Sequence, residues 1–592
     1  MIDKINAYFS QPLMKTLLIH IIFYCLSVLA VVLLHFSFAA TALAGILFVV
    51  CEAVIIFLQK YTWEKIKNAI WQNKVLFITA GLFLARTALT MLQCYAKLDH
   101  AQSYARMGSI LTLLILYGGS MFVHYMLSED HSLEKLFLLE ASVFGIVLMM
   151  IFPLYGVADE PKHMRTAYDL SNTMLMIPKT PEGIYMRKDD ADFDMNYVGY
   201  NTEQIVDYVN QMAAPLESDE LVLVTDKTEF SYTLEYTRRP SVIRGESYQY
   251  LFTALGITLG RLMGVNTVTM YLMGRFFNML FYIIVMYFCI KLVPIGKILF
   301  YSIALLPMPM HMAASTSRDA FRIACPALLI ALTLYLLFNE DISDKKKKIL
   351  SAVLVVTGLL LFPLRRYAYA FIALFPPVVY VYKKEIISRK VLHRIFFGLC
   401  GLVVLFIIFK GFIYRGNLIP EPQLLVSKSG EPGYTKEFFF NHPLTLIRLF
   451  KNSLMIDGYW YITTMIGEYL GWLDVSYPDI FVFSLLLVLI LNTIPRSYET
   501  VEMPAIFKFA LFTMSVLTIL LSLTGMAMTY TAMTMDTIDG IQGRYFLPVA
   551  YPLLLSFNNR SVLAHRSMDI FTICLQFITT QYILQFLLMR LF

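Results

Sequence analysis

Two adjacent carboxylates and a histidine, in the segment Asp159-Glu160-Pro161-Lys162-His163, have the types and spacing needed for acid–base or metal chemistry. Either carboxylate could take a proton from an acceptor hydroxyl. Together with His163, the pair could also hold a divalent cation such as Mg²⁺ or Mn²⁺ against a phosphate. The same residues fit the start of a helix, with Asp159 as its N-cap and Pro161 in its first turn. The sequence leaves the catalytic, metal-binding and capping interpretations open.

A second acidic candidate and three arginines follow at wide spacing. Asp319 stands at the start of an expected helix, where it could act on a substrate or, like Ser317, cap the helix. Arg365 and Arg366 occupy a tight turn, and Arg544 precedes an apolar segment. Guanidinium groups at a membrane boundary suit a donor phosphate, although the arginine pair could instead reach lipid head groups.

Two aromatic-rich segments supply further candidates for substrate binding. GEYLGWLD (467–474) contains Glu468 and Asp474, and IQGRYFLP (541–548) contains Gln542 and Tyr545. Anchoring at the membrane interface is the alternative for the first segment.

The composition indicates the kind of element that positions these residues. Of 592 residues, 58% are hydrophobic and 15% are charged, against about 25% charged in a typical soluble protein. A soluble fold of this length could not cover so much apolar surface, so we predict an α-helical polytopic membrane protein. Disorder and a disulfide scaffold are excluded, and a net charge of +6 gives no reason to expect nucleic acid as a partner.

A spanning helix needs about 20 mostly apolar residues, which predicts roughly 14 spans in this chain. The candidate segments lie near 15–36, 38–58, 75–95, 107–127, 134–154, 267–290, 297–314, 320–338, 348–364, 366–382, 395–414, 479–495, 505–525, 544–558 and 569–590. Some short segments abut, so the number of spans is defined to within one or two.

Two hydrophilic insertions interrupt the spans, at 156–266 and at 415–478. The larger is expected to be an α/β element, because 220–236 alternates like strands. Residues 246–264 form an amphipathic pattern suited to a helix on the bilayer surface.

Three basic loops, near 59–74, 339–348 and 383–394, predict which end of each span is cytoplasmic. Both insertions and the connectors that carry the acidic residues and arginines then share the extracytoplasmic side. We therefore predict that these widely spaced residues meet in one pocket at the lipid boundary.

Two further features are expected to be structural. Glu52 and Arg86, in neighbouring spans at similar depth, should form an ion pair. His311 is expected to be an ordinary helix-end histidine.

From about residue 134 to the end, the chain resembles a bacterial family of polytopic predicted membrane proteins, grouped with the GT-C glycosyltransferase superfamily. The resemblance rests on five motifs in series: ADEPKHMRTAYDLS (158–171), YLFTALGITLGRLMGVNTVTMYLMGRFFN (250–278), STSRDA (315–320), GEYLGWLD (467–474) and IQGRYFLP (541–548).

The resemblance implies a GT-C-like membrane core at 131–592, with accessory helices at 1–130. It implies Asp159 or Glu160 as base or metal ligand and Asp319 as a second acid. Arg544 would bind the donor phosphate, assisted by Arg365 or Arg366. GT-C enzymes use polyprenyl-phosphate sugars at the outer membrane boundary.

These observations predict an inverting glycosyltransferase of the bacterial cell membrane, with its active site on the extracytoplasmic side. Its donor would be a polyprenyl-phosphate sugar and its acceptor a cell-surface glycan or polymer; the sequence names no protein partner. A transporter or flippase of lipid-linked glycans is the alternative, but it predicts ionisable residues near mid-bilayer and paired broken helices. A non-catalytic scaffold of a polysaccharide complex is the third hypothesis.

Overall fold

The computed structural model describes residues 12–591, apart from 36, 60–62, 97–101, 129–131, 181, 196–207, 213, 226–245, 386–390, 392–393, 395–401, 403–404, 406 and 411–430. Its α-helices are α2 (Pro12–Leu33), α3 (Phe38–Leu58), α4 (Trp63–Gln72), α5 (Lys74–Ala96), α6 (Gln102–Leu127), α7 (Leu133–Ile151), α8 (Glu160–Met174), α9 (Lys188–Met195), α11 (Leu251–Leu262), α12 (Thr267–Leu292), α13 (Lys297–Ala304), α14 (Pro307–Ala313), α15 (Asp319–Phe338), α16 (Asp344–Leu361), α17 (Leu364–Tyr367), α18 (Ala370–Ala373), α19 (Phe375–Lys383), α21 (Lys436–Asn441), α22 (Pro443–Ile456), α23 (Gly458–Ile466), α24 (Asp479–Thr493), α25 (Ala505–Tyr530), α26 (Leu547–Ser556) and α27 (Ser567–Leu591). The 3₁₀ helices are η1 (Ser247–Tyr250) and η2 (Gly543–Phe546), and the strands are β1 (Gly183–Arg187), β2 (Leu221–Thr225), β3 (Tyr469–Leu470) and β4 (Val475–Ser476).

Eight of the described helices are long and apolar enough to cross a membrane: α2, α3, α5, α6, α12, α15, α25 and α27. This agrees with the predicted polytopic membrane protein, while the number of spans and the GT-C-like arrangement stay predictions. Prolines explain why some expected spans form shorter helices. The run at 297–314 is divided into α13 and α14 at Pro307, which lacks an amide hydrogen and disfavours helix in the residue before it. Part of the run at 395–414 lies outside the described residues.

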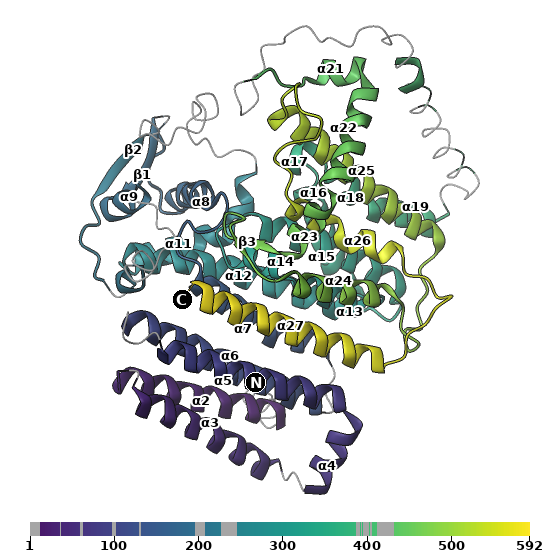
Figure 1. Cartoon of the computed structure of the whole chain (residues 1–592). Coiled ribbons are helices and arrows are strands. Elements are labelled where there is room, and N and C mark those ends of the chain that lie inside the picture. The colour runs from purple at the N-terminus through teal and green to yellow at the C-terminus, as the bar shows by residue number, and fades with distance from the viewer. Residues whose placement is uncertain are drawn as a thin grey trace.

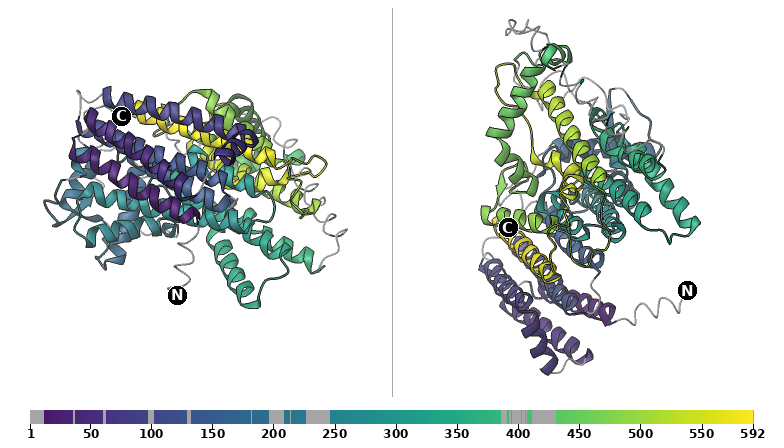
Figure 2. Two further views of the ribbon diagram at one scale, coloured as in Figure 1. Left: turned by 90° about the horizontal axis from the view of Figure 1, so that it is seen from below. Right: turned by 90° about the vertical axis from the view of Figure 1, so that its right-hand side faces the viewer.

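The N-terminal helices form a layer against the rest of the molecule (Figures 1 and 2). Within the layer α2 packs on α3 and α6, and α5 packs on α6. The layer meets the remaining helices where α7 packs on α6 and the C-terminal helix α27 packs on α5. The rings of Phe122 and Phe577 stack at this boundary with centroids 3.8 Å apart.

The expected ion pair between Glu52 and Arg86 does not form. Glu52 is bound by His20 and His124 instead, with its carboxylate oxygens 3.3 and 2.8 Å from the two imidazole nitrogens. The guanidinium of Arg86 lies over the ring of Tyr582, 5.9 Å from its centroid. Arg86 is half-exposed where α5 packs on α27. Glu52 and Arg86 therefore point towards different neighbouring helices, although they lie at similar depth.

The larger insertion contains a small α/β element, at the left of Figure 1. Strands β1 and β2 pair antiparallel, with Gly183 opposite Thr225 and Arg187 opposite Leu221. The alternating segment at 220–236 therefore begins with a strand, and the rest of it lies outside the described residues. The partner strand β1 comes from a segment in which we expected no strand.

Helix α11 confirms the amphipathic helix expected at 246–264. Its exposed leucines, Leu251, Leu255, Leu259 and Leu262, recur at helical spacing along one face. Its opposite face packs closely on α12, where a Cβ added at Gly256 would lie 2.3 Å from the carbonyl oxygen of Met273. Glycine at this position thus allows the two backbones to approach.

We expect Gly256→Ala to lower the thermal unfolding midpoint of the detergent-purified protein, because overpacking against backbone costs about 1–3 kcal/mol. Gly45→Ala in α3 is the matched control, since nothing lies within 4 Å of a Cβ there. The control should unfold at or above the wild-type midpoint, because alanine favours helix by about 1 kcal/mol. Equal midpoints for both variants would contradict the close approach.

Candidate functional site

Asp159 occupies the N-cap position of α8, but its side chain makes no capping hydrogen bond. Its backbone is left-handed, with φ 62°, a conformation that costs a non-glycine residue on the order of 1 kcal/mol and is often found at functional sites. The carboxylate is 53% exposed, and its Oδ2 accepts a hydrogen bond of 2.9 Å from Nη2 of Arg544. The predicted N-cap position of Asp159, with Pro161 in the first turn, is therefore confirmed, but the side chain does not cap the helix and faces Arg544 instead.

Glu160 points the opposite way, into the protein. Both of its oxygens are bound by Arg275, at 2.8 and 2.6 Å, and neither side chain is more than 1% exposed. Arg275 also donates to the carbonyl oxygens of Met149, Phe152 and Pro153 at the end of α7. The expectation that Glu160 acts as a base or metal ligand is corrected: its lone pairs are engaged in a buried ion pair.

Arg544 joins the two acidic candidates. Besides its bond to Asp159, its Nε lies 3.7 Å from Oδ2 of Asp319 at the start of α15. The guanidinium is 3% exposed. Gly543 fixes this position, because a Cβ there would lie 2.1 Å from the carbonyl oxygen of Tyr461. The structure thus brings together three predicted residues that are separated by up to 385 positions.

Two arginines that the sequence analysis did not select complete this cluster. Arg322, one turn beyond Asp319, lies 3.7 Å from its carboxylate and donates to Gln249 at 2.7 Å. It also pairs with Glu246 at 3.2 Å. Arg318 acts electrostatically on both Asp319 and Glu246. The signal was available in the sequence, since Arg318 adjoins Asp319 and Arg322 is a charge inside an apolar run.

Arg365 lies over the face of Tyr545, with its guanidinium carbon 3.9 Å from the ring centroid, and has a left-handed backbone. The same ring is 5.5 Å from the guanidinium carbon of Arg544. Tyr545 therefore contacts both guanidinium groups. The side chain of Arg366, in α17, lies outside the described part of the structure.

We call Arg318, Arg322, Arg365 and Arg544, with Asp159, Asp319 and Glu246, the charge cluster. Four guanidinium groups face three carboxylates, which leaves a surplus of positive charge. The buried Nε–H groups of Arg365 and Arg544 make no hydrogen bond among the described residues, and the 3.7 Å between Nε of Arg544 and Asp319 is too long for one. Buried unpaired donors are rare and need an explanation. An anion such as a phosphate would supply the missing acceptors.

The charges also perturb the residues around Asp159. Burial alone would raise the pKa of Asp159, but the guanidinium of Arg544 and the nearby Lys162 hold it below its usual range. Burial and the positive charge of Arg318 hold the pKa of His163 well below its usual range, so its ring is neutral. Nδ1 of His163 is 2.7 Å from the hydroxyl of Tyr250.

The expected metal set does not assemble. Glu160 is committed to Arg275 and His163 to Tyr250, and among the described residues these two and Asp159 form no group of three converging ligand atoms. Only Asp159 presents free carboxylate surface. Asp159, Glu160 and His163 therefore do not converge as a ligand set in this structure, and metal binding at this position stays a prediction.

The turn between β3 and β4 packs beside Asp159. The Gly471 amide donates to Nε2 of His311 at 3.0 Å, and the Gly471 carbonyl accepts from the amide of Ala158 at 3.1 Å. The Trp472 indole donates to the carbonyl of Tyr155. His311 thus has a specific structural role that its position at a helix end did not reveal, and it helps hold the segment that leads into Asp159.

Asp474, Glu468 and Gln542 have different surroundings. The exposed Asp474 accepts a hydrogen bond from the backbone amide of Trp472 and so stabilises the turn. Glu468 and Gln542 are less accessible, and Oε2 of Glu468 and Oε1 of Gln542 are buried without a hydrogen-bond partner among the described residues. Direct contact with substrate stays a prediction for all three.

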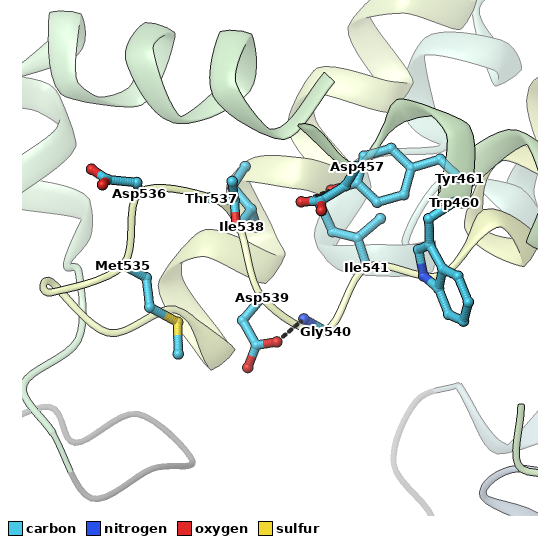
Figure 3. Close-up of a pocket in the computed structure, with 10 residues that line it drawn as sticks. All are labelled: Asp457, Trp460, Tyr461, Met535, Asp536, Thr537, Ile538, Asp539, Gly540 and Ile541. Carbon is cyan, nitrogen blue, oxygen red and sulfur yellow. Dashed lines mark hydrogen bonds between the residues drawn. The ribbon is translucent and has the colours of Figure 1, made fainter. Parts of the chain in front are cut away.

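A cavity of about 400 Å³ lies next to the segment that carries Arg544 (Figure 3). Residues from the start of α23 form one side of it, and the loop 535–541 forms the other. Its lining is acidic and aromatic: Asp457, Trp460, Tyr461, Met535, Asp536, Thr537, Ile538, Asp539, Gly540 and Ile541. The loop continues directly into η2, so the cavity and Arg544 are joined by a few residues of chain.

The two neighbouring carboxylates should differ sharply in their effect on stability. Glu160→Gln leaves the buried Arg275 without its counter-charge, which should lower the free energy of unfolding by about 3–5 kcal/mol. Asp159→Asn should change it by less than about 1 kcal/mol, because the pair is half-exposed and asparagine tolerates the left-handed backbone. Thermal unfolding in detergent measures both, and a larger loss for Asp159→Asn would contradict this assignment.

His163 predicts a pH dependence. As the pH falls through about 6.5, the unfolded chain gains a proton at His163 that the folded chain does not, so stability falls by up to about 1.4 kcal/mol per pH unit. Unfolding midpoints between pH 7 and pH 5 should therefore fall less in His163→Gln than in wild type. His565→Gln, at an exposed position, should follow the wild-type slope. A wild-type slope in His163→Gln would be evidence against a buried neutral ring.

Comparison with known proteins identifies the family. A family model described as "Predicted membrane protein (DUF2142)" matches residues 142–553, well over half of the chain. The match includes Asp159, Asp319 and Arg544 and begins after the four helices α2, α3, α5 and α6. No match was found among curated proteins or solved structures. The chain is thus a member of the DUF2142 family of predicted membrane proteins.

Proposed function

We propose that this chain is a GT-C-like membrane glycosyltransferase, which moves a sugar from a polyprenyl-phosphate donor to a glycan or polymer acceptor. The observation that carries the proposal is the charge cluster, in which Arg544 contacts both Asp159 and Asp319. Such a site combines cations for a phosphate leaving group with a carboxylate that is open to an acceptor.

The position of the cluster suits a lipid-linked donor. Helix α15 begins at Asp319, and the basic segment Lys345–Lys348 follows its other end. Helix α16 returns from that segment towards Arg365. The cluster and the basic segment therefore lie at opposite ends of these helices. The positive-inside rule assigns the basic end to the cytoplasm, and hence the cluster to the extracytoplasmic side of a bacterial cell membrane.

The donor phosphate would bind between Arg544 and Arg365. Their Nε–H groups, which make no hydrogen bond among the described residues, supply two donors, and the surplus positive charge stabilises the phosphate as it leaves. Positive charge at this depth is costly unless it is paired or used. A phosphate would therefore resolve both the unpaired donors and the charge imbalance.

Asp159 is the base in this proposal. The acceptor hydroxyl oxygen forms a bond to the anomeric carbon while the bond from that carbon to the phosphate oxygen breaks. The electron pair leaves with the phosphate, and the hydroxyl proton passes to Asp159. Attack opposite the leaving group inverts the anomeric centre. Once phosphate shares Arg544, the carboxylate loses part of its partner and becomes more basic.

The acidic and aromatic cavity beside Arg544 suits the acceptor. Its carboxylates can accept hydrogen bonds from sugar hydroxyls, and Trp460 and Tyr461 offer apolar ring surface. Its proximity to η2 along the chain allows the acceptor and the donor phosphate to be held by one segment. Participation of a divalent cation in this reaction stays a prediction, because Asp159, Glu160 and His163 form no three-ligand set among the described residues.

Two substitutions separate the proposed roles. Asp159→Asn should lower kcat by about 10²–10⁴, the usual contribution of a general base. Arg544→Lys keeps the charge but loses the forked donor, and should raise the donor KM by at least about tenfold. The measurement is release of polyprenyl phosphate from a panel of synthetic polyprenyl-phosphate sugars, by the full chain in vesicles with a glycan acceptor.

Arg560→Lys is the matched control, because Arg560 follows α26, does not belong to the charge cluster and donates to the backbone carbonyls of Glu499 and Thr500. It should retain wild-type rates. Full activity of folded Asp159→Asn and Arg544→Lys would overturn the proposed site. Movement of intact donor across the vesicle membrane without release of polyprenyl phosphate would favour a flippase instead.

A further inference from the structure

The N-terminal helices contain a second group of chemically capable side chains, outside the family match. His20 from α2, Cys51 and Glu52 from α3, and His124 from α6 meet in the packed layer. The imidazoles are 3% and 9% exposed, and Cys51 is fully buried. Ionisable groups within membrane helices are expensive and usually have a function.

Donor atoms of three of these residues converge, and His124 adjoins them through Glu52. One atom each from His20, Cys51 and Glu52 lies within 4.8 Å of the others. Nε2 of His124 is 2.8 Å from Oε2 of Glu52, and the two imidazole centroids are 5.5 Å apart. Two imidazole nitrogens, a carboxylate and a sulfur form a set that suits zinc-class dications, while Mg²⁺ and Ca²⁺ prefer oxygen.

The hydrogen-bond pattern around His20 points to a cation. Nδ1 of His20 is 2.8 Å from the carbonyl oxygen of Thr16, so this nitrogen must carry the proton. In a neutral ring Nε2 then has only a lone pair, and it faces Oε1 of Glu52 at 3.3 Å. The Ser120 hydroxyl is 3.2 Å from Nε2 and 2.5 Å from Oε1, but it has one hydrogen for both. In a neutral ring the lone pair of Nε2 thus faces the carboxylate, a deficit of positive charge that a cation would fill.

A bound metal ion accounts for this deficit. Histidine ligands typically donate their second ring N–H to a backbone carbonyl, as His20 does to Thr16. We propose that His20, Cys51, Glu52 and His124 bind one zinc-class dication, which ties α2, α3 and α6 together. Binding releases the thiol proton of Cys51 to solvent and leaves the thiolate on the metal. The proposal is independent of the glycosyltransferase activity.

The competing explanation is a proton. A doubly protonated His20 would also satisfy Glu52, without any metal and without a role for Cys51. The two explanations differ in what Cys51 and His124 contribute, and a metal with a sulfur-sensitive spectrum separates them.

The test is a Co²⁺ titration of the full chain, purified in detergent without a polyhistidine tag. Wild type should bind about one Co²⁺ per chain, with the visible bands of a tetrahedral site and a sulfur-to-cobalt charge-transfer band. Zn²⁺ should displace the cobalt and Mg²⁺ should not. Cys51→Ser should lose the charge-transfer band, and His124→Gln should weaken binding by at least about tenfold.

The matched controls are Cys94→Ser, at another buried cysteine in the same layer, and His35→Gln, at an exposed histidine beyond α2. Both should titrate like wild type, and circular dichroism should report the same helix content for all variants. Absence of a stoichiometric cobalt spectrum would overturn the site. So would a spectrum unchanged by Cys51→Ser and His124→Gln. An infrared carboxyl band that titrates with pH and disappears in Glu52→Gln, with no cobalt bound, would assign the cluster to a proton.

Discussion

The buried ion pair of Glu160 and Arg275 is the interaction on which the site depends. Arg275 satisfies carbonyl oxygens at the end of α7, while Glu160 also accepts from the backbone amide of Thr316, just before α15. One carboxylate and one guanidinium thereby join α7, α8, α12 and the segment leading to Asp319. Desolvation makes such a pair costly to break, since removal of either partner leaves an unpaired charge.

That pair also explains the direction of Asp159. Glu160 is held inside the protein, and the left-handed backbone at Asp159 turns the Asp159 side chain to the surface, towards Arg544. Strain of this kind persists only where the surroundings over-determine it. Here they do so from two sides, through the buried ion pair and through the turn between β3 and β4.

Part of this arrangement could be predicted from the sequence. The positions of Asp159, Asp319 and Arg544 beside expected spans indicated a shared site, because alternating spans return the chain to the same side. The different roles of Asp159 and Glu160 could not be predicted, since adjacent carboxylates differ only through a backbone angle and a distant arginine. Arg322 was missed because it lies inside an apolar run, where hydropathy averages conceal a single charge.

The N-terminal layer shows the same limit. Depth along the membrane suggested that Glu52 would pair with Arg86, but rotation about each helix axis decides which side chains meet. Helix α5 turns Arg86 towards α27, while α2 and α6 place histidines against Glu52. Spacing in the sequence predicts the depth of a residue in the membrane, but packing decides which neighbouring helix its side chain faces.

The exposed leucine face of α11 suits contact with the acyl chains of a bilayer. Arg261 and Thr258 of the same helix hydrogen-bond to Ser171 in α8, the helix that begins beside Asp159. A helix that lies on acyl chains and is tethered to α8 would pass a change in bilayer thickness on to the position of Asp159. The lipid composition of the membrane would then influence the distance between Asp159 and Arg544.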